Sequence, residues 1–522
     1  MLQSLSLPHL IDIVQGKIVQ DKIVQDKIVR DKTVQDQVLL PQATTSNHHH
    51  HGKNDDEHFD TYAIKITGVS TDSRTIKKGD LFIALCGANY DGHHFIQQAV
   101  QQGAVAVLAS RKTACLPVPV ILVQDSLLAY GLLAKWHRQQ FTGLVIAITG
   151  SNGKTSVKQM LFQLLHGTTS VYAAHANYNN EIGVPCSLLQ LESHHLSAVF
   201  ELGARKTGDI AYLSTMVQPD IAVITNIGES HLAYFGSQMN IARTKSEIVQ
   251  GLRTGGSIIL PYDTPHYPLL RELAQSHTKK SKGCMIVFSL HNPEADIYAS
   301  QIRMVDQYQQ FTLQVRMHGI QEHADVMLPL FGKHHVYNFI AAAAVCIQLG
   351  DALASITAKA RRLQPVPGRL EPMILPNGHL LINDSYNASP SSVRAAIDVL
   401  CEQAGYDSRV LILADMLELG EQSLALHQDV GRYAAVRSVD VMLTLGPAAQ
   451  QSMQTFKERH TQGRTATAEN LDHLYELVCH YLTDKTKHGN KVVLLVKGSH
   501  GMQLQNLVQQ LMVRSINPAY TG

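Results

Sequence analysis

The sequence predicts an α/β protein with three domains. Its 522 residues are too many for one hydrophobic core, so several domains are expected. Short apolar runs typical of buried strands alternate with helical patterns, and this order produces mostly parallel sheets covered by helices. We expect a small N-terminal α/β domain at residues 1–142, a central domain with a mostly parallel sheet at 143–363, and a C-terminal Rossmann-like domain at 364–522.

The central domain begins with LVIAITGSNGKTSVKQMLFQLL at residues 144–165, which predicts a phosphate-binding loop. A strand, a glycine-containing turn at 150–153 and a helix opening at Lys154 direct N–H groups and a helix dipole at a phosphate. Lys154 supplies charge for the terminal phosphates, and the Thr155 hydroxyl can reach a magnesium ion. Ile148 stands where the eight-residue P-loop pattern has its first glycine. The flanking pattern nevertheless favours a nucleotide site over an ordinary strand-to-helix turn with a surface lysine.

Polar side chains follow two later strands of the central domain. Glu201 ends the strand predicted at 198–201, and His231 comes shortly after the strand predicted at 221–225. Because the carboxyl ends of parallel strands meet at one edge of a sheet, both side chains are expected beside the phosphate loop, where they suit magnesium. A lone histidine after a strand is more often a capping or packing residue, but two such strand ends favour a metal site.

The C-terminal domain starts after a linker-like segment at 365–369 and has the pattern of a second doubly wound sheet. Its strands are predicted at 380–383, 410–414, 441–445 and 492–496. Polar side chains follow three of them, namely Asp384, Tyr386, Asn387, Asp415, Glu418 and Lys497. We expect a ligand-facing edge here, although charged strand ends alone are typical of solvated loops.

The N-terminal domain contains a low-complexity insertion at about residues 17–58. It holds a five-residue repeat, KIVQD, whose period fits neither a strand nor a heptad, and four consecutive histidines at 48–51. These histidines could bind a metal, but a solvated segment without chemistry is the favoured interpretation. Residues 70–74 then gather polar groups at the end of a strand, which either hold a ligand or cap a turn.

Composition and targeting signals predict a soluble cytoplasmic protein. The formal net charge of +1 gives no reason to expect binding to nucleic acid or to an anionic membrane. Seven dispersed cysteines without a C-x-x-C pair suggest reduced thiols. The start of the chain lacks the features of a signal peptide, and the longest apolar run, at 339–347, is typical of a buried helix. We therefore expect no membrane insertion, and we expect a monomer.

A series of motifs resembles the Mur ligase family, the ATP-dependent amide-forming enzymes of peptidoglycan precursor synthesis. The motifs occur in family order from about residue 61 to the end of the chain. They are TGSNGKTS (149–156), NYNNEIGVP (177–185), FELGA (200–204), TNIGESHL (225–232), ARTKSEI (242–248), GKHHVYNFIAA (332–342), PGRLE (367–371), NDSYNASPSSVRAA (383–396), ADMLELG (414–420) and VKGSHGM (496–502). The N-terminal TDSR, GDLFIAL and DGHHF segments, with DSYNASP and DMLELG, most resemble the branch that adds D-alanyl-D-alanine.

The resemblance implies a reaction as well as a fold. One domain would bind a UDP-sugar peptide, the central domain would be an ATPase, and the third would close on the nucleotide. ATP would phosphorylate the terminal carboxylate of UDP-MurNAc-tripeptide with Mg²⁺ as cofactor, and the amine of D-Ala-D-Ala would attack the acyl phosphate, releasing phosphate and ADP. The activation is needed because a carboxylate is a poor acylating agent, and lysine and magnesium are needed to neutralise the approaching anions.

The resemblance also assigns roles to individual residues. The implied catalytic residues are Lys154, His231 and Lys245, the last of which matches a carbamylated lysine of the family. The residues expected to contact ATP are Gly150, Ser151, Asn152, Gly153, Lys154, Thr155, Ser156, Asn338, Arg369 and Asp384. The expected magnesium ligands are Thr155, Glu201, His231 and Lys245. The expected substrate contacts are Ser73 and Arg74 for the UDP-sugar, with Asn177 and Asn180 in a segment that faces the substrate.

The sequence departs from the family pattern at several positions. His335 and Ser389 stand where asparagine is usual, Ala414 replaces a glycine, and His500 replaces an arginine. The phosphate loop and the metal residues are intact, so an active enzyme is expected. The alternatives are the ligase that adds the third amino acid, whose D-N-P-R signature is missing here, folylpolyglutamate synthase, which has no such N-terminal substrate domain, and a non-catalytic nucleotide-binding regulator.

Overall fold

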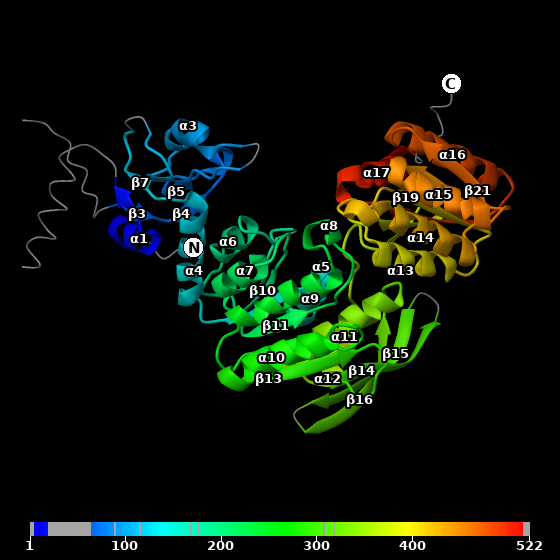
Figure 1. The fold of residues 1–522 in the computed structure, drawn as a ribbon, viewed down its shortest axis with the longest axis horizontal. Helices are drawn as coiled ribbons and strands as arrows, with labels where there is room; N and C mark the ends of the chain where they lie inside the picture. Colours follow the sequence, from blue (N-terminus) through cyan, green and yellow to red (C-terminus); the bar gives the residue numbers. More distant parts are fainter. Residues whose placement is uncertain are drawn as a thin grey trace, which may run out of the picture. The chain divides into compact units, whose positions relative to one another are not determined.

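The computed structural model describes residues 5–18, 64–87, 90–113, 116–167, 170–175, 177–305, 308–317 and 319–514. The chain divides into two compact units, which are coloured along the sequence in Figure 1. Unit 1 consists of Met1–Thr142 and Glu181–His194, and unit 2 consists of Gly143–Asn180 and His195–Gly522. Each unit has sheets packed against helices, which confirms the predicted α/β class. None of the helices in these ranges is both long and apolar enough to cross a membrane.

Unit 1 contains a five-stranded sheet with the order β2-β7-β6-β5-β4 and a two-stranded sheet of β1 and β3. Strands β4 to β7 are parallel, and β2 is antiparallel to β7. Helices α1 and α4 pack on one face of the larger sheet, while α3 packs on the other. The elements are β1 (Leu5–Ser6), α1 (Leu7–Val14), β2 (Lys17–Ile18), β3 (Lys65–Ile66), β4 (Gly68–Ser70), β5 (Asp80–Ile83), α3 (Ile96–Gln101), β6 (Ala106–Ala109), β7 (Val120–Leu122), α4 (Ser126–Gln140) and α6 (Gly183–Leu188).

The low-complexity insertion begins within the described residues. Its first two residues, Lys17 and Ile18, form β2 and pair with β7 at the edge of the sheet. A repeat period of five does not predict this strand, because the partner strand rather than the period sets the local structure. The rest of the repeat and the histidines at 48–51 lie outside the described residues.

Helix α6 belongs to unit 1, although it lies within the predicted central domain. Cys186 of α6 packs against the core cluster that contains Tyr130 of α4. Just beyond α6, the carbonyl oxygen of Leu191 lies 3.0 Å from Nε2 of His137, again on α4. The apolar spacing of a short helix does not tell which neighbour the helix covers. The sequence therefore could not indicate that α6 packs in unit 1.

Unit 2 begins with a nine-stranded sheet of the order β16-β15-β14-β13-β12-β11-β8-β10-β9. All pairings from β9 to β14 are parallel, while β14, β15 and β16 form an antiparallel extension that the sequence did not predict. The order reverses around β8, and ligands of such sheets bind at the carboxyl ends of the strands at this point. The elements are β8 (Leu144–Thr149), α5 (Lys154–Leu165), β9 (Val171–Ala173), β10 (Ser197–Glu201), α7 (Asp209–Val217), β11 (Ile221–Ile224), α8 (Leu232–Phe235), α9 (Gln238–Ser246), β12 (Ser257–Pro261), α10 (Tyr267–Ser281), β13 (Cys284–Ser289), β14 (Ile297–Val305), β15 (Tyr308–Met317), β16 (Ile320–Leu328), α11 (Lys333–Gln348) and α12 (Leu353–Ala360).

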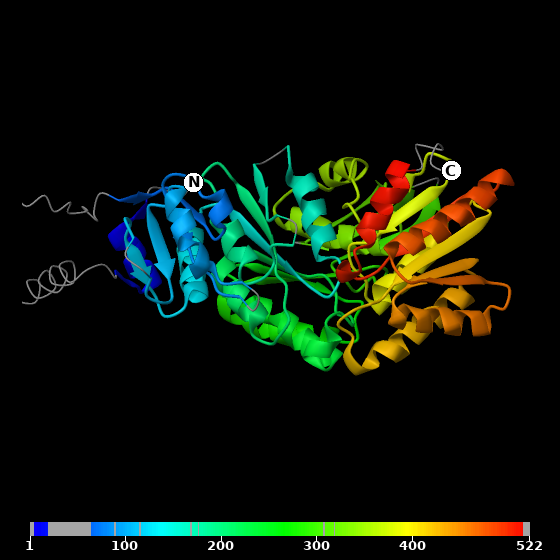
Figure 2. The same ribbon diagram turned by 90° about the horizontal axis from the view of Figure 1, so that it is seen from above.

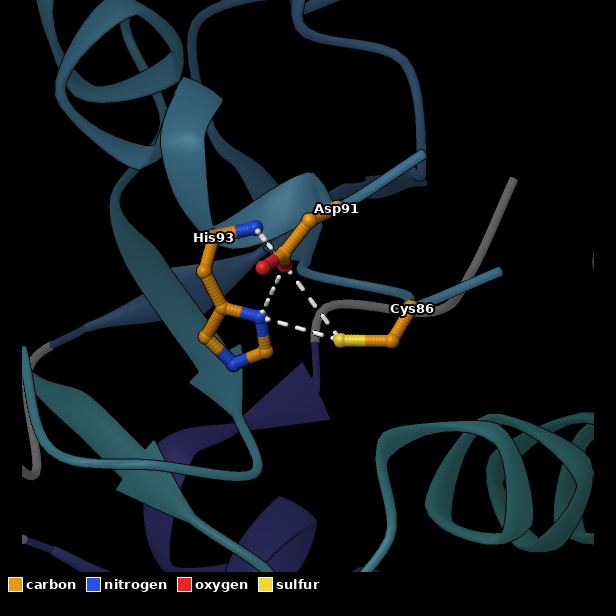
Figure 3. A group of neighbouring side chains, drawn as sticks. All are labelled: Cys86, Asp91 and His93. Carbon is orange, nitrogen blue, oxygen red and sulfur yellow. Dashed lines mark hydrogen bonds and ion pairs between the residues drawn. The ribbon is translucent and has the colours of Figure 1, made fainter. Parts of the chain in front are cut away.

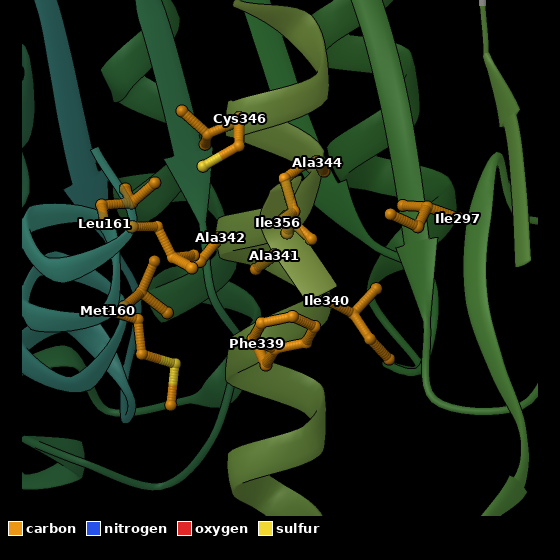
Figure 4. Close-up of a cluster of buried hydrophobic side chains, with 14 of the residues drawn as sticks. Met160, Leu161, Ile297, Phe339, Ile340, Ala341, Ala342, Ala344, Cys346 and Ile356 are labelled. Carbon is orange, nitrogen blue, oxygen red and sulfur yellow. The ribbon is translucent and has the colours of Figure 1, made fainter. Parts of the chain in front are cut away.

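Helix α5, which follows the predicted phosphate loop, is packed against α11 in the core of the nine-stranded sheet. Met160 and Leu161 of α5 lie beside Ala341 and Ala342 of α11 (Figure 4). The small alanine side chains let the two helices approach closely, so the loop at the start of α5 is held on a rigid support. Helix α11 confirms the buried helix predicted at 339–347.

The remainder of unit 2 contains a six-stranded sheet of the order β17-β18-β22-β19-β20-β21, in which only β17 is antiparallel. Helices α13, α14 and α15 cover one face, and α16 and α17 cover the other (Figures 1 and 2). This confirms the second doubly wound sheet and its four predicted strands. The elements are β17 (Glu371–Ile374), β18 (Leu380–Asp384), α13 (Pro390–Cys401), β19 (Ser408–Ala414), α14 (Ser423–Val436), β20 (Val441–Leu445), α15 (Pro447–Arg459), β21 (Arg464–Ala468), α16 (Leu471–Lys487), β22 (Val492–Lys497) and α17 (Leu504–Arg514).

The packing of α5 leads to a stability prediction. Leu161 is completely buried, so Leu161→Ala should lower the unfolding free energy of the central sheet by about 2–5 kcal/mol, the cost of lost burial and a cavity. The control is Leu196→Ala, because 58% of Leu196 is exposed and the change should stay within about 0.5 kcal/mol. Hydrogen exchange of the 144–165 segment in increasing urea measures the free energy of unfolding of both variants. An equal loss in Leu161→Ala and Leu196→Ala would contradict the packing.

Candidate functional site

The turn between β8 and α5 has a backbone that only glycine adopts easily. Gly150 and Gly153 have φ angles of 145° and 82°. A Cβ atom at Gly150 would overlap the hydroxyl of Thr225, and one at Gly153 would overlap the amide oxygen of Asn338. The loop is therefore enclosed by side chains that follow β11 and begin α11. This places Asn338, which is 7% exposed, directly against the loop.

The segment after β11 binds the loop through a series of hydrogen bonds. The N–H groups of Ser151 and Asn152 donate to the carbonyl and the side-chain oxygen of Asn226 at 3.0 and 2.8 Å. The Thr225 hydroxyl donates to the carbonyl of Asn152, and Gly228 N–H donates to the hydroxyl of Ser151. Two N–H groups of the loop are thus already used within the protein. The N-terminal turn of α5, which has no side-chain cap, supplies the N–H groups suited to a phosphate.

Lys154 lies over the loop that precedes it. Its ammonium donates to the carbonyl oxygens of Gly150 at 2.7 Å and Ser151 at 3.2 Å. Burial lowers the pKa of Lys154, the carboxylate of Glu201 opposes this shift, and the guanidinium of Arg369 adds to it. A buried cation held close to other cations is a site that an anion would stabilise.

Thr155 and Glu201, which were both predicted as magnesium ligands, are in direct contact. The Thr155 hydroxyl donates to Oε2 of Glu201 at 2.9 Å. The other carboxylate oxygen accepts from the amide of Asn179 at 2.8 Å, so the side chain is held from both sides. Hydroxyl and carboxylate oxygens suit magnesium, and the pair therefore fits the predicted ion. The role of Asn179 was missed, although it lies in the NYNNEIGVP motif between the two asparagines that were selected.

Arg369 connects the start of the C-terminal domain to the phosphate loop. Its Nη2 donates to the Thr155 hydroxyl at 3.2 Å, and its guanidinium stacks on the ring of Tyr386 at 4.3 Å from the centroid. Nε of Arg369 is buried and has no hydrogen-bond partner among the described residues, which leaves a donor available to a ligand. The stacking role of Tyr386 was not predicted; the only signal was its place after a strand.

Asp384 supports Arg369 rather than facing outward. One carboxylate oxygen accepts from the ammonium of Lys497 at 2.5 Å, and the other accepts from Leu370 N–H at 3.2 Å. Burial raises the pKa of Asp384, and the ammonium of Lys497 opposes that shift. The pair therefore anchors the segment that carries Arg369. The sequence indicated Lys497 only as a polar residue at a strand end.

His231 and Lys245 complete the predicted set. His231 has a φ of 62°, and its Nδ1 donates to Oε2 of Glu418 at 2.6 Å, which leaves Nε2 for another ligand. Burial and the charge of Lys154 lower the pKa of His231. Lys245 is 1% exposed and makes no hydrogen bond or ion pair with the described side chains. Burial, with the charge of Lys154, lowers the pKa of Lys245 to about 7, against the opposing carboxylates of Asp209, Glu201 and Glu247.

The predicted substrate contacts lie in different environments. Ser73 is buried, and its hydroxyl donates to Gln98 at 3.1 Å inside unit 1. The Arg74 side chain is 81% exposed and pairs with Asp72 at 2.7 Å. Asn177 and Asn180 of unit 2 are exposed. Their roles in substrate binding stay predictions.

Three of the positions that depart from the family pattern have defined contacts in the structure. Ser389 caps α13, and its hydroxyl donates to Oδ1 of Asn152 at 3.2 Å, so it still reaches the loop. The ring of His500 lies edge-on to Tyr386 at 5.7 Å. His335 is 4% exposed and lies 4.5 Å from the ring of His334. Its Nδ1 finds no hydrogen-bond partner within the described ranges.

Comparison with known families agrees with this geometry. The descriptions "Mur ligase family, catalytic domain", "Mur ligase middle domain" and "Mur ligase, glutamate ligase domain" match residues 65–128, 148–346 and 368–500. The chain therefore belongs to the Mur ligase family.

Individual relatives extend the likeness over almost the whole chain. UDP-N-acetylmuramoyl-tripeptide–D-alanyl-D-alanine ligase of Escherichia coli is 36% identical over 449 residues, which cover 86% of this chain and 94% of that protein. A crystal structure of MurF from Acinetobacter baumannii is 30% identical, has a TM-score of 0.81, and is matched over 98% of this chain and 99% of its own. MurF ligase from Thermotoga maritima, solved in complex with ADP, is 25% identical with a TM-score of 0.75 over 86% and 97% of the two chains. The three-domain α/β fold class is thereby confirmed.

Buried His335 leads to a prediction for pH dependence. Burial holds the pKa of His335 well below 6.5, whereas the unfolded chain titrates near that value. Below pH 6.5 the unfolded state therefore binds a proton that the folded state does not. Each further unit by which the pH falls lowers the free energy of unfolding by up to about 1.4 kcal/mol. His335→Asn should reduce the stability lost between pH 7.5 and 5, as measured by urea unfolding at both values. The exposed His480→Asn serves as the control, and an unchanged loss in His335→Asn would contradict the buried neutral state.

Proposed function

We propose that this protein is an ATP-dependent, ADP-forming ligase that joins D-Ala-D-Ala to UDP-MurNAc-tripeptide, the step that completes the cytoplasmic pentapeptide precursor of peptidoglycan. The contact of Thr155 with Glu201 beside Lys154 carries the proposal, because it combines a phosphate site with an oxygen-ligand pair for magnesium. The near full-length likeness to relatives with this printed activity selects the two substrates.

The residues of the loop meet the charge requirements of the reaction. The substrate carboxylate must approach the γ-phosphate, and two anions repel each other unless cations lie between them. Lys154 and the N-terminal turn of α5 bind the β- and γ-phosphates. Arg369 offers its buried Nε as a further donor, held in place by Tyr386 and by the Asp384–Lys497 pair. Asn338 lies on the other side of the loop, in position to contact the nucleotide.

Magnesium, when bound, supplies charge neutralisation for the transferred phosphoryl group. Thr155 and Glu201 would hold one ion through oxygen atoms. His231 would add Nε2, since its Nδ1 is fixed by Glu418. The structure thus assigns a positioning task to Glu418, whereas the sequence only places it after a strand.

Lys245 takes the role of the family's carbamylated lysine in this proposal. The ammonium first loses one proton. The neutral ε-amine then adds to carbon dioxide, forming N–COO⁻ and releasing a second proton, so a buried cation becomes an anion. Burial at 1% exposure with no pairing carboxylate in contact favours such a change, since an isolated buried ammonium is costly. The new carboxylate would face Lys154, the cation whose charge now destabilises the ammonium.

The other substrate contacts remain part of the proposal. Ser73 and Arg74 would act on the UDP-sugar side, and Asn177 and Asn180 on the side of the acceptor peptide. The protein is proposed to work as a monomer. A ligase for the third amino acid and a non-catalytic nucleotide-binding regulator are the alternatives, and substrate dependence separates all three.

Phosphate release from the purified protein tests the proposal. With ATP, Mg²⁺, UDP-MurNAc-tripeptide and D-Ala-D-Ala, release should require every component, and mass spectrometry should show a product heavier by one dipeptide. Tripeptides ending in lysine and in diaminopimelate are both supplied. Nucleotide binding without turnover of either tripeptide would support the regulator instead, and turnover of the dipeptide precursor with a free diamino acid would support the third-residue ligase.

Lys154→Met should abolish most of this activity. Loss of the ammonium removes the charge that offsets the γ-phosphate, so kcat should fall on the order of 10²–10³-fold. Lys279→Met, at an exposed position near the end of α10, provides a matched control. Equal rates in the two variants would show that Lys154 does not contact the transferred phosphate.

Carbamylation of Lys245 can be detected directly. Protein equilibrated with ¹³C-bicarbonate should show a carbamate carbon signal in NMR that is missing in Lys245→Arg and present in the exposed control Lys206→Arg. Lys245→Ala should lose activity and regain part of it with added acetate, whose carboxylate can occupy the vacated space. An unlabelled Lys245 in a fully active enzyme would disprove this role.

A further inference from the structure

A compact group of three potential metal ligands lies in unit 1, outside the proposed ligation site. Oδ1 of Asp91 lies 2.9 Å from Nδ1 of His93, and Sγ of Cys86 lies 3.3 Å from Oδ1 and 3.4 Å from Nδ1. Figure 3 shows the three side chains pointing toward one another. Elsewhere in the described part of the chain, no other three histidine, cysteine, aspartate or glutamate side chains bring their ligand atoms this close.

The backbone holds this group at the edge of the sheet where ligands usually bind. Cys86 follows the carboxyl end of β5, and Asp91 caps the 3-10 turn Gly92–Phe95, in which His93 lies. The two ends of the intervening loop are joined by a bridge between Cys86 and Asp91. A hydrogen bond of 2.7 Å from Gly92 N–H to the carbonyl of Leu85 closes the loop further. The three ligands are therefore placed before any metal arrives.

Asp91 and His93 are each held by a residue that follows β6. The guanidinium of Arg111 pairs with Oδ2 of Asp91, which leaves Oδ1 to face the centre of the group. Nε2 of His93 accepts a hydrogen bond from the N–H of Ser110 at 3.2 Å and lies 3.4 Å from the Ser110 hydroxyl, so the ring proton is on Nδ1, which donates to Oδ1 of Asp91. Only 7% of the His93 side chain is exposed, so its ring cannot turn away freely. These contacts orient the side chains of Asp91 and His93.

We propose that Cys86, Asp91 and His93 form a binding site for a divalent transition-metal ion, with zinc as the best match. For tetrahedral zinc with ordinary bond lengths, two ligand atoms lie about 3.4–3.6 Å apart. The sulfur distances of 3.3 and 3.4 Å almost match this edge, and the oxygen and nitrogen need to separate by a few tenths of an ångström from 2.9 Å. A thiolate and an imidazole select zinc over magnesium and calcium.

The protons and charges balance for this ion. On binding, the thiol of Cys86 loses its proton to solvent. The proton on Nδ1 of His93 moves to Nε2, which gives up the hydrogen bond from Ser110 N–H and donates to the Ser110 hydroxyl instead. The thiolate and the carboxylate then neutralise the two positive charges of the ion. Arg111 keeps its ion pair with Oδ2 of Asp91. Cys86 is exposed, so the fourth position stays open to water or to an anionic oxygen. The bound ion would join Cys86 to Asp91 and His93.

Cobalt substitution tests the site, because a cobalt–thiolate bond gives a charge-transfer band in the near ultraviolet. The full chain is first made with His48, His49, His50 and His51 changed to alanine, so that this histidine tract cannot compete. Chelator-stripped protein is titrated with Co²⁺ in excess Mg²⁺ and a non-thiol reductant. One equivalent should produce the band, and Zn²⁺ should displace it.

Two variants separate this site from other thiols. Cys86→Ser should lose the band completely, while Cys479→Ser, a half-buried cysteine of α16, should keep it. His93→Gln should weaken cobalt binding at least tenfold. A band that survives in Cys86→Ser, or no band in the parent chain, would overturn the proposal.

Alkylation provides a readout that does not depend on the folding of a variant. The protein is the parent chain that differs only in the alanines at positions 48–51. In this protein Zn²⁺ should slow iodoacetamide labelling of Cys86 at least tenfold, as measured by peptide mass spectrometry. Labelling of Cys284 and Cys479 should not change. Equal protection of all three cysteines, or none at Cys86, would count against the site.

Discussion

At Gly150 and Gly153 the backbone passes so close to Thr225 and Asn338 that no side chain fits between them. The hydrogen bonds from this loop to Asn226 hold it open in a single shape. The N-terminal turn of α5 then points out of the sheet edge without a side-chain cap. Every other group of the site is arranged around this turn. The close packing of α5 on α11 supplies the rigid support that keeps it there.

Cations gather around the loop in a way that folding alone does not favour. Lys154, Lys245 and His231 each have a pKa that is lowered by burial, and Lys154 contributes to the shift in both of the others. Positive charges placed this close together raise the energy of the protein unless anions join them. A nucleoside triphosphate would supply such anions. Residues with perturbed pKa values often gather at functional sites for this reason. The carboxylate of Glu201 opposes the shift at both Lys154 and Lys245.

Residues of the C-terminal domain complete the loop's surroundings. Arg369 reaches Thr155, Ser389 reaches Asn152, and Glu418 orients His231. Both His231 and Glu418 have left-handed φ angles of 62°, an unfavourable conformation for residues other than glycine. Such strain persists where the surrounding contacts over-determine the backbone, and these two residues bond directly to each other. The C-terminal domain therefore contributes to the geometry of the predicted phosphate site.

Much of this could be predicted because the relevant signals are local. The alternation of apolar strands and helical patterns indicates both doubly wound sheets, and the glycines before Lys154 indicate the phosphate turn. The motif order selects the family. The antiparallel extension β14–β16 and the transfer of α6 to unit 1 could not be predicted, since a segment's own spacing does not name its partner.

The sequence by itself determined the fold class and selected the candidate site residues, because these depend on residue types at short spacings. Only the tertiary structure decided which side chains meet. It placed Asn179 on Glu201, Lys497 under Asp384 and Tyr386 beneath Arg369. These contacts join segments that lie far apart in the chain. They could not be predicted from the sequence, because strand register and packing at the sheet edges determine them and a local pattern of residues does not.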